Sequence, residues 1–247
     1  MGKPGDRLTG EPLNRRMGDR TMTTKTTGKA GEKTAGATDE AVARALLDRQ
    51  RRTYAAQAGI RLRNTPAPLY QTLVLAILLS APIRSGTAVA AARALFDAGM
   101  RTPRAMADAS WQQRVDALGE GGYRRYDERT STMLGKGAEL LLERHGGDLR
   151  RLREEPDPKK ALMGIPGIGP TGVDIFLRDV QGVWPEYAPY IDRKALDGAR
   201  RLGLPASPDR LSSLVSAREM PRLADGLVHA ALDKPLADEV LTAAGAA

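Results

Sequence analysis

Apolar residues recur at helical spacing along the chain from Thr38 onward. Val42 and Leu46 lie four positions apart on one helical face, and Thr38 precedes them as a residue type that caps helices. The segment 69–80 is apolar nearly all round, which is typical of a buried helix, and Pro82 is expected to end it. Runs with the alternation of a half-buried strand are not found. The pattern therefore predicts an all-α protein of roughly ten helices with short connections.

Breaks between helices are predicted where proline and glycine gather. The prolines in 64–68 are expected to break the chain before the buried helix, and Gly146-Gly147 to stop a long amphipathic helix. Further helices are expected over residues 85–98, 126–145, 157–163, 172–180, 192–202, 209–215 and 218–231, with a short one opened by Thr102-Pro103.

Composition divides the chain into a tail and a helical body. Residues 1–37 are rich in Gly, Thr and Lys and have few bulky apolar side chains, so we expect a disordered basic tail. They hold eight Lys or Arg and four Asp or Glu, so their net charge is +4, half of the net charge of +8 of the whole chain. The tail either adds sequence-independent attraction to phosphates or is an inert leader. Residues 38–247 form the body, where a nucleic-acid site must be a local basic patch.

The residue types that are missing exclude several kinds of chemistry. Zero cysteines exclude disulfide scaffolds, zinc–thiolate sites, Fe–S clusters and cysteine nucleophiles. With two histidines, a histidine-rich metal site or a Ser-His-Asp triad is also disfavoured, and we expect no metal. No apolar run approaches the roughly 20 residues of a membrane span. We therefore expect a cytoplasmic protein, with no membrane partner, that acts through carboxylates, Lys, Arg, hydroxyl groups or backbone amides.

The segment 162–177 carries the most informative motif, a Pro-Gly-Ile-Gly-Pro turn between two helical stretches. Its glycines let backbone N–H groups approach a phosphate without a Cβ in the way, and the helix that starts at the second proline adds positive partial charge there. The isoleucine is expected to pack inward. Neither a Walker loop nor a dinucleotide fingerprint fits, because the Gly-Lys-Ser/Thr ending and a preceding strand are both missing. Either the turn is a tight connection between packed helices, or its residues contact phosphates: Gly167, Ile168, Gly169, Pro170, Thr171 and Gly172.

Other motifs stand in a consistent order around this turn. It is followed by a loop that contains Trp184-Pro185 and then by Tyr190-Ile-Asp192, which ends 23 positions after the second glycine. Upstream of the turn, the buried helix ends in Leu78-Leu-Ser-Ala81. Gly122-Tyr123 lies between the end of that helix and the turn. This order resembles the helix-hairpin-helix DNA glycosylases of the endonuclease III superfamily, over about residues 65–205.

The resemblance implies a fold, a partner and a reaction. The implied fold has two helical lobes, a helix-hairpin-helix at about 160–180, and a DNA-binding cleft between the lobes. The implied partner is double-stranded DNA with a damaged or mismatched base, bound by a monomer. Asp192 is the implied catalytic carboxylate, which stabilises an oxocarbenium ion and orients water at the sugar C1′. Side chains implied in the base pocket or in DNA contacts are Tyr190, Tyr123, Pro82 and Lys194.

Departures from the family pattern narrow the expected chemistry. Thr171 stands where bifunctional members carry the lysine that forms a Schiff base, so we expect a monofunctional base-excision enzyme. Pro82 replaces the polar residue that many relatives insert into the gap left by the flipped base. The four C-terminal cysteines of many relatives are absent, so no Fe–S cluster is expected. A monovalent cation at the hairpin carbonyls, found in relatives, is compatible with this turn.

Alternative interpretations remain for the same residues. Asp192 is also a good helix N-cap, Lys194 is either a displaced nucleophile or a surface lysine, and the tyrosines are candidates for ordinary core packing. Two rival functions follow. One is an abasic-site lyase or endonuclease that uses another amine, and the other is a non-catalytic DNA-binding protein of the same fold.

Overall fold

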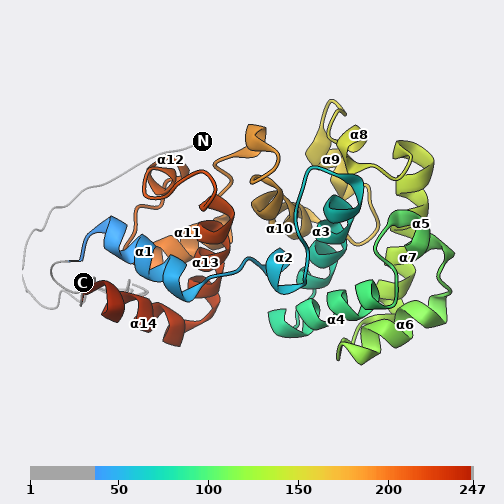
Figure 1. The fold of residues 1–247 in the computed structure, drawn as a ribbon, viewed down its shortest axis with the longest axis horizontal. Helices are drawn as coiled ribbons and strands as arrows, with labels where there is room; N and C mark the ends of the chain where they lie inside the picture. The colour runs from blue at the N-terminus through green and yellow to red at the C-terminus, as the bar shows by residue number, and fades with distance from the viewer. Residues whose placement is uncertain (1–36, 246–247) are drawn as a thin grey trace, which may run out of the picture.

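The computed structural model describes residues 37–245, which form helices and loops without a strand. This confirms the all-α prediction. The helices gather into two lobes with separate hydrophobic cores (Figure 1). The predicted basic tail, residues 1–37, lies outside the described residues except for Ala37. Over the range 37–245, no helix combines the length and apolar character needed to cross a membrane.

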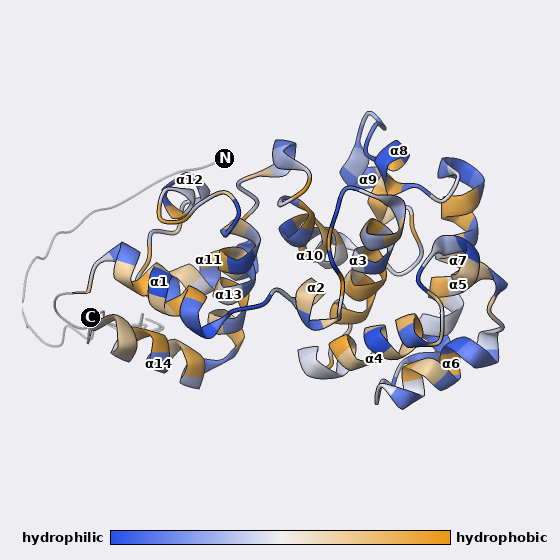
Figure 2. Cartoon of the chain, in the orientation of Figure 1, coloured by the Kyte–Doolittle hydropathy of each residue, from blue (hydrophilic) through white to orange (hydrophobic). Residues whose placement is uncertain are grey.

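The larger lobe is organised around α3 (Pro66–Leu79), whose residues from Leu69 to Leu78 are all buried. Because α3 is apolar nearly all round, other helices must enclose it, and α4, α8 and α10 pack against it. The helices of this lobe besides α3 are α2 (Tyr54–Gln57), α4 (Ser85–Asp97), α5 (Pro103–Asp108), α6 (Trp111–Glu120), α7 (Asp127–His145), α8 (Leu149–Leu152), α9 (Pro158–Met163) and α10 (Pro170–Val180). Helices on the outside of the molecule, such as α6 and α14, mix hydrophobic and hydrophilic residues along their length, as expected when one face is buried (Figure 2).

Among the helices that the structure describes, the smaller lobe combines the first one with the last four. It contains α1 (Asp39–Arg49), α11 (Arg193–Arg201), α12 (Pro208–Ser212), α13 (Met220–Leu232) and α14 (Lys234–Gly245). α1 packs against α13 and α14, and α11 packs along α13. At that crossing, a Cβ on Gly198 would lie 1.8 Å from the carbonyl oxygen of Leu227, so the two backbones need glycine there. A short 3-10 helix, η1 (Pro185–Tyr187), lies in the connection from α10 to α11.

Several helix boundaries differ from the predictions. α3 begins at Pro66, three residues before the predicted start, because prolines are tolerated in the first turn of a helix, where N–H groups have no intrahelical partner. The predicted break is therefore confined to the residues before Pro66, and residues 66–68 form the first turn of the helix. The sequence also did not predict α2, α6, α8 and α14, although α6 carries a capping box formed by Ser110 and Gln113.

Candidate functional site

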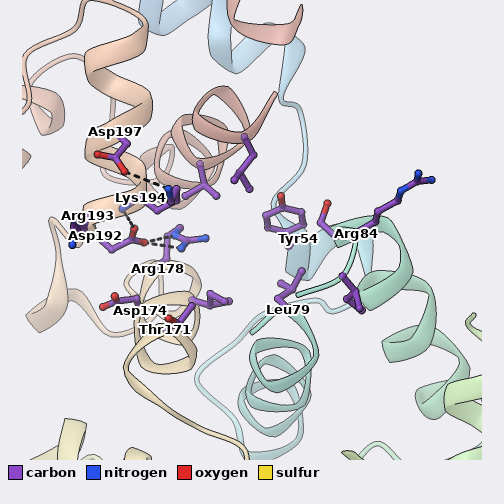
Figure 3. A pocket seen from close by; sticks show the side chains of 15 residues that line it. Tyr54, Leu79, Arg84, Thr171, Asp174, Arg178, Asp192, Arg193, Lys194 and Asp197 are labelled. Atoms are coloured by element: carbon purple, nitrogen blue, oxygen red, sulfur yellow. Dashed lines mark hydrogen bonds and ion pairs between the residues drawn. The ribbon is translucent and has the colours of Figure 1, made fainter. Parts of the chain in front are cut away.

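A cavity of about 720 Å³ lies between the two lobes (Figure 3). The larger lobe contributes side chains from α2, α3, the start of α4 and α10, and the smaller lobe contributes the start of α11 and the end of α13. Figure 3 shows two facing sides: Thr171, Asp174, Arg178 and Asp192 lie on one, and Tyr54, Leu79 and Arg84 on the other. The labelled aspartates thus lie on one side of the cavity, and the opposite side combines Tyr54 and Leu79 with the cation of Arg84.

Asp192 lines this cavity, and it is also the N-cap of α11. Its Oδ1 accepts hydrogen bonds from the backbone N–H groups of Lys194 at 2.7 Å and Ala195 at 3.0 Å. Its Oδ2 accepts from Nε of Arg178 at 2.8 Å and lies 2.6 Å from Nη2 of the same guanidinium. Only 3% of the side chain is exposed. Asp192 therefore caps α11, and four N–H groups occupy its two oxygens. Its catalytic role stays a prediction.

Arg178 was not predicted from the sequence, yet it is the central cation of the junction. It is fully enclosed and also pairs with Asp225 of α13, with Nη1 and Oδ1 3.3 Å apart. The other oxygen of Asp225 accepts from the backbone N–H of Tyr54 at 2.8 Å. Burial lowers the pKa of Arg178, but Asp225 and Asp192 outweigh it and the net pKa is raised. The arginine therefore stays charged and connects α10 to both α11 and α13.

Two aspartates of this region have raised pKa values. Burial raises the pKa of Asp179 well above its ordinary range, and the neighbouring Asp225 raises it further. Burial also raises the pKa of Asp225, although Arg178 opposes this. The physical cause is the same in both cases: a carboxylate removed from water favours its neutral form unless a cation balances it.

The glycine-rich turn joins α9 to α10 as expected. Gly167 has φ +92°, a conformation that favours glycine, and Ile168 is 5% exposed, which confirms that its side chain packs inward. Gly169 is exposed with open space around it, and no side chain caps α10. Pro170 and Thr171 are exposed and Gly172 is buried. Gly169 to Thr171 are therefore the accessible part of this segment, whereas Ile168 and Gly172 are buried and the backbone N–H of Ile168 donates to the carbonyl of Ile165.

Residues of this turn also line a separate groove of about 410 Å³. It brings together three of the predicted segments, Pro82, Tyr123 and the range 167–169, with Arg129 beside them. Pro82 is exposed, but Tyr123 is 2% exposed and its hydroxyl oxygen lies 3.4 Å from Oγ1 of Thr130. Tyr123 therefore packs in the core of the larger lobe and presents little ring surface for stacking.

The remaining predicted residues lie at or beside the interlobe cavity. Lys194 lines it with 51% of its side chain exposed, and its Nζ pairs with Asp197 at 3.3 Å. The hydroxyl of Tyr190 donates to Oδ1 of Asp174 at 2.6 Å, and the ring lies under Nζ of Lys159 at 5.0 Å. Asp174 was missed by the sequence analysis. Its spacing of three residues from Thr171 on one helix places both on the same face, and that signal could have identified it.

No group of three His, Asp or Glu side chains is arranged to hold a metal in the part of the chain that the structure describes. The monovalent cation at the hairpin stays a prediction.

Comparison with protein-family models and with curated proteins gave no match. The solved structures that align with the chain include the following two. One is a non-covalent endonuclease III–DNA complex, with 16% identity and a TM-score of 0.48. The other is a trapped endonuclease III–DNA covalent intermediate, an estranged-adenine complex, with 17% identity and a TM-score of 0.45. Each alignment covers 78% of this chain and 85% of the other. Similarity at this level assigns no role to any residue here.

Proposed function

We propose that this protein is a base-excision DNA glycosylase that binds double-stranded DNA containing a damaged or mismatched base. One observation carries the proposal: a single helix, α10, contributes both to a surface that can bind a phosphate and to the cavity that can receive a nucleotide. Its N-terminus is uncapped and accessible at Gly169 to Thr171, and the same helix continues into the cavity with Asp174 and Arg178. An uncapped helix end attracts a phosphate, and a cavity one or two turns further along can receive the nucleotide that is rotated out of the duplex.

The cavity has the size and chemistry for this role. Its volume lies within the roughly 300–1,000 Å³ of small-molecule sites, and the side chains of Tyr54 and Leu79 can pack against a base. Aspartate side chains on the opposite side supply negative charge near the sugar, where an oxocarbenium ion would develop. Thr171 at the mouth has no amine, so we propose hydrolysis without strand cleavage, which leaves an abasic site.

Two rival functions each have one supporting observation. The occupied oxygens of Asp192 favour a DNA-binding protein without turnover. Lys194, the lysine that lines the cavity, favours an abasic-site lyase, because an exposed amine can form an imine with the opened sugar.

An oligonucleotide panel separates the three functions. Duplexes that each carry one deaminated, oxidised, alkylated or mismatched base are incubated with the full-length protein, and strand breaks are counted with and without alkali. We expect breaks only after alkali for at least one duplex. Alkali-independent breaks, together with a borohydride-trapped adduct lost in Lys194→Ala, would show the lyase. Specific binding without any breaks would show the non-catalytic protein.

A further inference from the structure

Three aspartates line the cavity between the lobes, and they differ in whether their oxygens are free. Asp197 lies at the rim, where it pairs with Lys194 at 3.3 Å and with Arg200 at 3.0 Å. Asp192 is enclosed, and four N–H groups occupy its two oxygens. A carboxylate with filled acceptor positions has no lone pair with which to take a proton from water.

Asp174 is arranged differently. It projects from α10 one turn after Thr171 and is partly exposed in the cavity, on the same side as Asp192 (Figure 3). Its Oδ1 accepts one strong hydrogen bond, from the Tyr190 hydroxyl at 2.6 Å. Among the described residues, no donor or cation is bound to Oδ2. Asp174 is therefore the cavity aspartate that is held in place and still has a free acceptor.

Tyr190 is well suited to hold this carboxylate. Burial raises the pKa of the Tyr190 phenol, and the hydrogen bond to Asp174 raises it further. The phenol thus stays protonated at neutral pH and always donates. The cation of Lys159, 5.0 Å from the centre of its ring, adds a contact from α9 on the other side of the glycine-rich turn.

We propose that Asp174 is a catalytic residue that accepts a proton from the water that attacks the sugar. The proposal rests on the glycosylase function proposed above and assigns one step of it. The water oxygen bonds to C1′ while the C1′–N bond breaks and its electron pair leaves with the base. One water proton passes to Oδ2 of Asp174 and the other stays on the new hydroxyl of the abasic site. Solvent protonates the departing base and later takes the proton from Asp174.

Single-turnover excision by Asp174 variants tests this role. Asp174→Asn keeps an oxygen for the Tyr190 hydroxyl but removes the base, so the rate should fall at least about 100-fold. The melting temperature and the affinity for DNA should stay close to wild type. Asp174→Glu keeps a carboxylate and should be at least tenfold faster than Asp174→Asn. The matched control is Asp116→Asn on α6, an exposed helix aspartate that accepts from the neutral Gln112 at 2.7 Å, and it should excise at the wild-type rate.

The outcomes distinguish this proposal from the one on which it rests. Excision by wild type that persists in Asp174→Asn, or equal rates for the Asn and Glu variants, overturns the role of Asp174 alone. A wild-type protein that excises no base from any duplex overturns both proposals together.

Discussion

Arg178 directs two N–H groups at one oxygen of Asp192, with Nε at 2.8 Å and Nη2 at 2.6 Å. Arg178 belongs to α10 of the larger lobe, and Asp192 caps the first helix after the connection to the smaller lobe. The side chains are 5% and 3% exposed, so the ion pair has little contact with water. A buried pair of this kind is stable only while both charges are present, because a lone buried charge is strongly unfavourable.

Replacing Arg178 with methionine tests how the lobes are joined. The variant leaves Asp192 and Asp225 buried without their cation, so the free energy of unfolding should fall by about 3–5 kcal/mol, measured with urea. The control is Arg150→Met, whose guanidinium pairs with Asp148 near the surface and should matter far less. Equal stability of the two variants would show that the Arg178 pairs do not hold the junction.

Asp192→Asn tests the negative charge of Asp192 separately from its role as the N-cap of α11. Asparagine caps helices about as well as aspartate, so the amides of Lys194 and Ala195 keep an acceptor. Only Asp225 then balances the charge of Arg178, the cavity loses one negative charge beside the sugar, and single-turnover excision should slow by about 100-fold. Asp148→Asn, at the cap of α8, should excise normally. If Asp192→Asn is folded by circular dichroism and excises at the full rate, Asp192 is only a structural cap.

Gly169→Asp should weaken DNA binding without harming the fold. Gly169 has φ −105° and open space around it, and aspartate is favoured at the N-cap, so the melting temperature should hold or rise slightly. The new carboxylate occupies the amides of α10 and repels phosphate, so the dissociation constant should rise at least tenfold. Gly169→Asn caps without charge and should weaken binding less. If both variants bind DNA with wild-type affinity, measured by fluorescence anisotropy at fixed salt, the turn does not belong to the DNA-binding surface.

Gly198→Ala should destabilise the smaller lobe. The added Cβ would lie 1.8 Å from the Leu227 carbonyl oxygen, so α11 and α13 must move apart. We expect a loss of about 3 kcal/mol or more in the free energy of unfolding. Gly119→Ala in α6 meets nothing within 4 Å and should instead stabilise the protein by up to about 1 kcal/mol. A Gly198→Ala protein as stable as wild type would contradict the close approach of the two helices.

His229 should make stability depend on pH. Burial lowers its pKa, although Asp225 opposes the shift, so the folded protein favours the neutral ring while the unfolded chain binds more protons. Its contribution is complete above about pH 6.5, the unfolded value, and is lost as the pH falls toward the folded value. The ring stacks on Tyr54 at 4.5 Å, and its Nε2 finds no partner among the described residues, so His229→Phe preserves the stacking without a titrating group. Between pH 7.5 and 5.5, wild type should lose stability relative to His229→Phe; parallel curves would contradict the shift.

Local sequence signals predicted much of the fold because they act over a few residues. Thr38 caps α1 and Asp192 caps α11, and Ile168 packs inward between two helices. The short helices α2 and α8, of four residues each, were not predicted, because one turn carries too few positions to show a period. α14 is longer, but it follows α13 so closely that no glycine or proline separates the two before Lys234.

The candidate site was predicted only in part because its key contacts join distant segments. Arg178 and Asp225 are 47 positions apart, and Tyr190 reaches Asp174 across 16 positions. Helical periodicity places Asp174 and Arg178 on one face of α10, but only the packing of the two lobes decides which carboxylates meet that face. The sequence therefore indicated Asp192 by motif, whereas the free acceptor of Asp174 became visible only in three dimensions.

The membership of α1 in the smaller lobe has a consequence for how the protein is made. As the chain emerges during synthesis, the apolar side chains of Val42, Leu46 and Leu47 stay exposed. They can be buried only after α13 and α14, nearly two hundred residues later, have been made. The nine helices from α2 to α10 can meanwhile assemble around their own core. Helix α1 thus finds its partners late, and until α13 and α14 have been synthesised the nascent chain exposes an apolar surface to which a chaperone can bind.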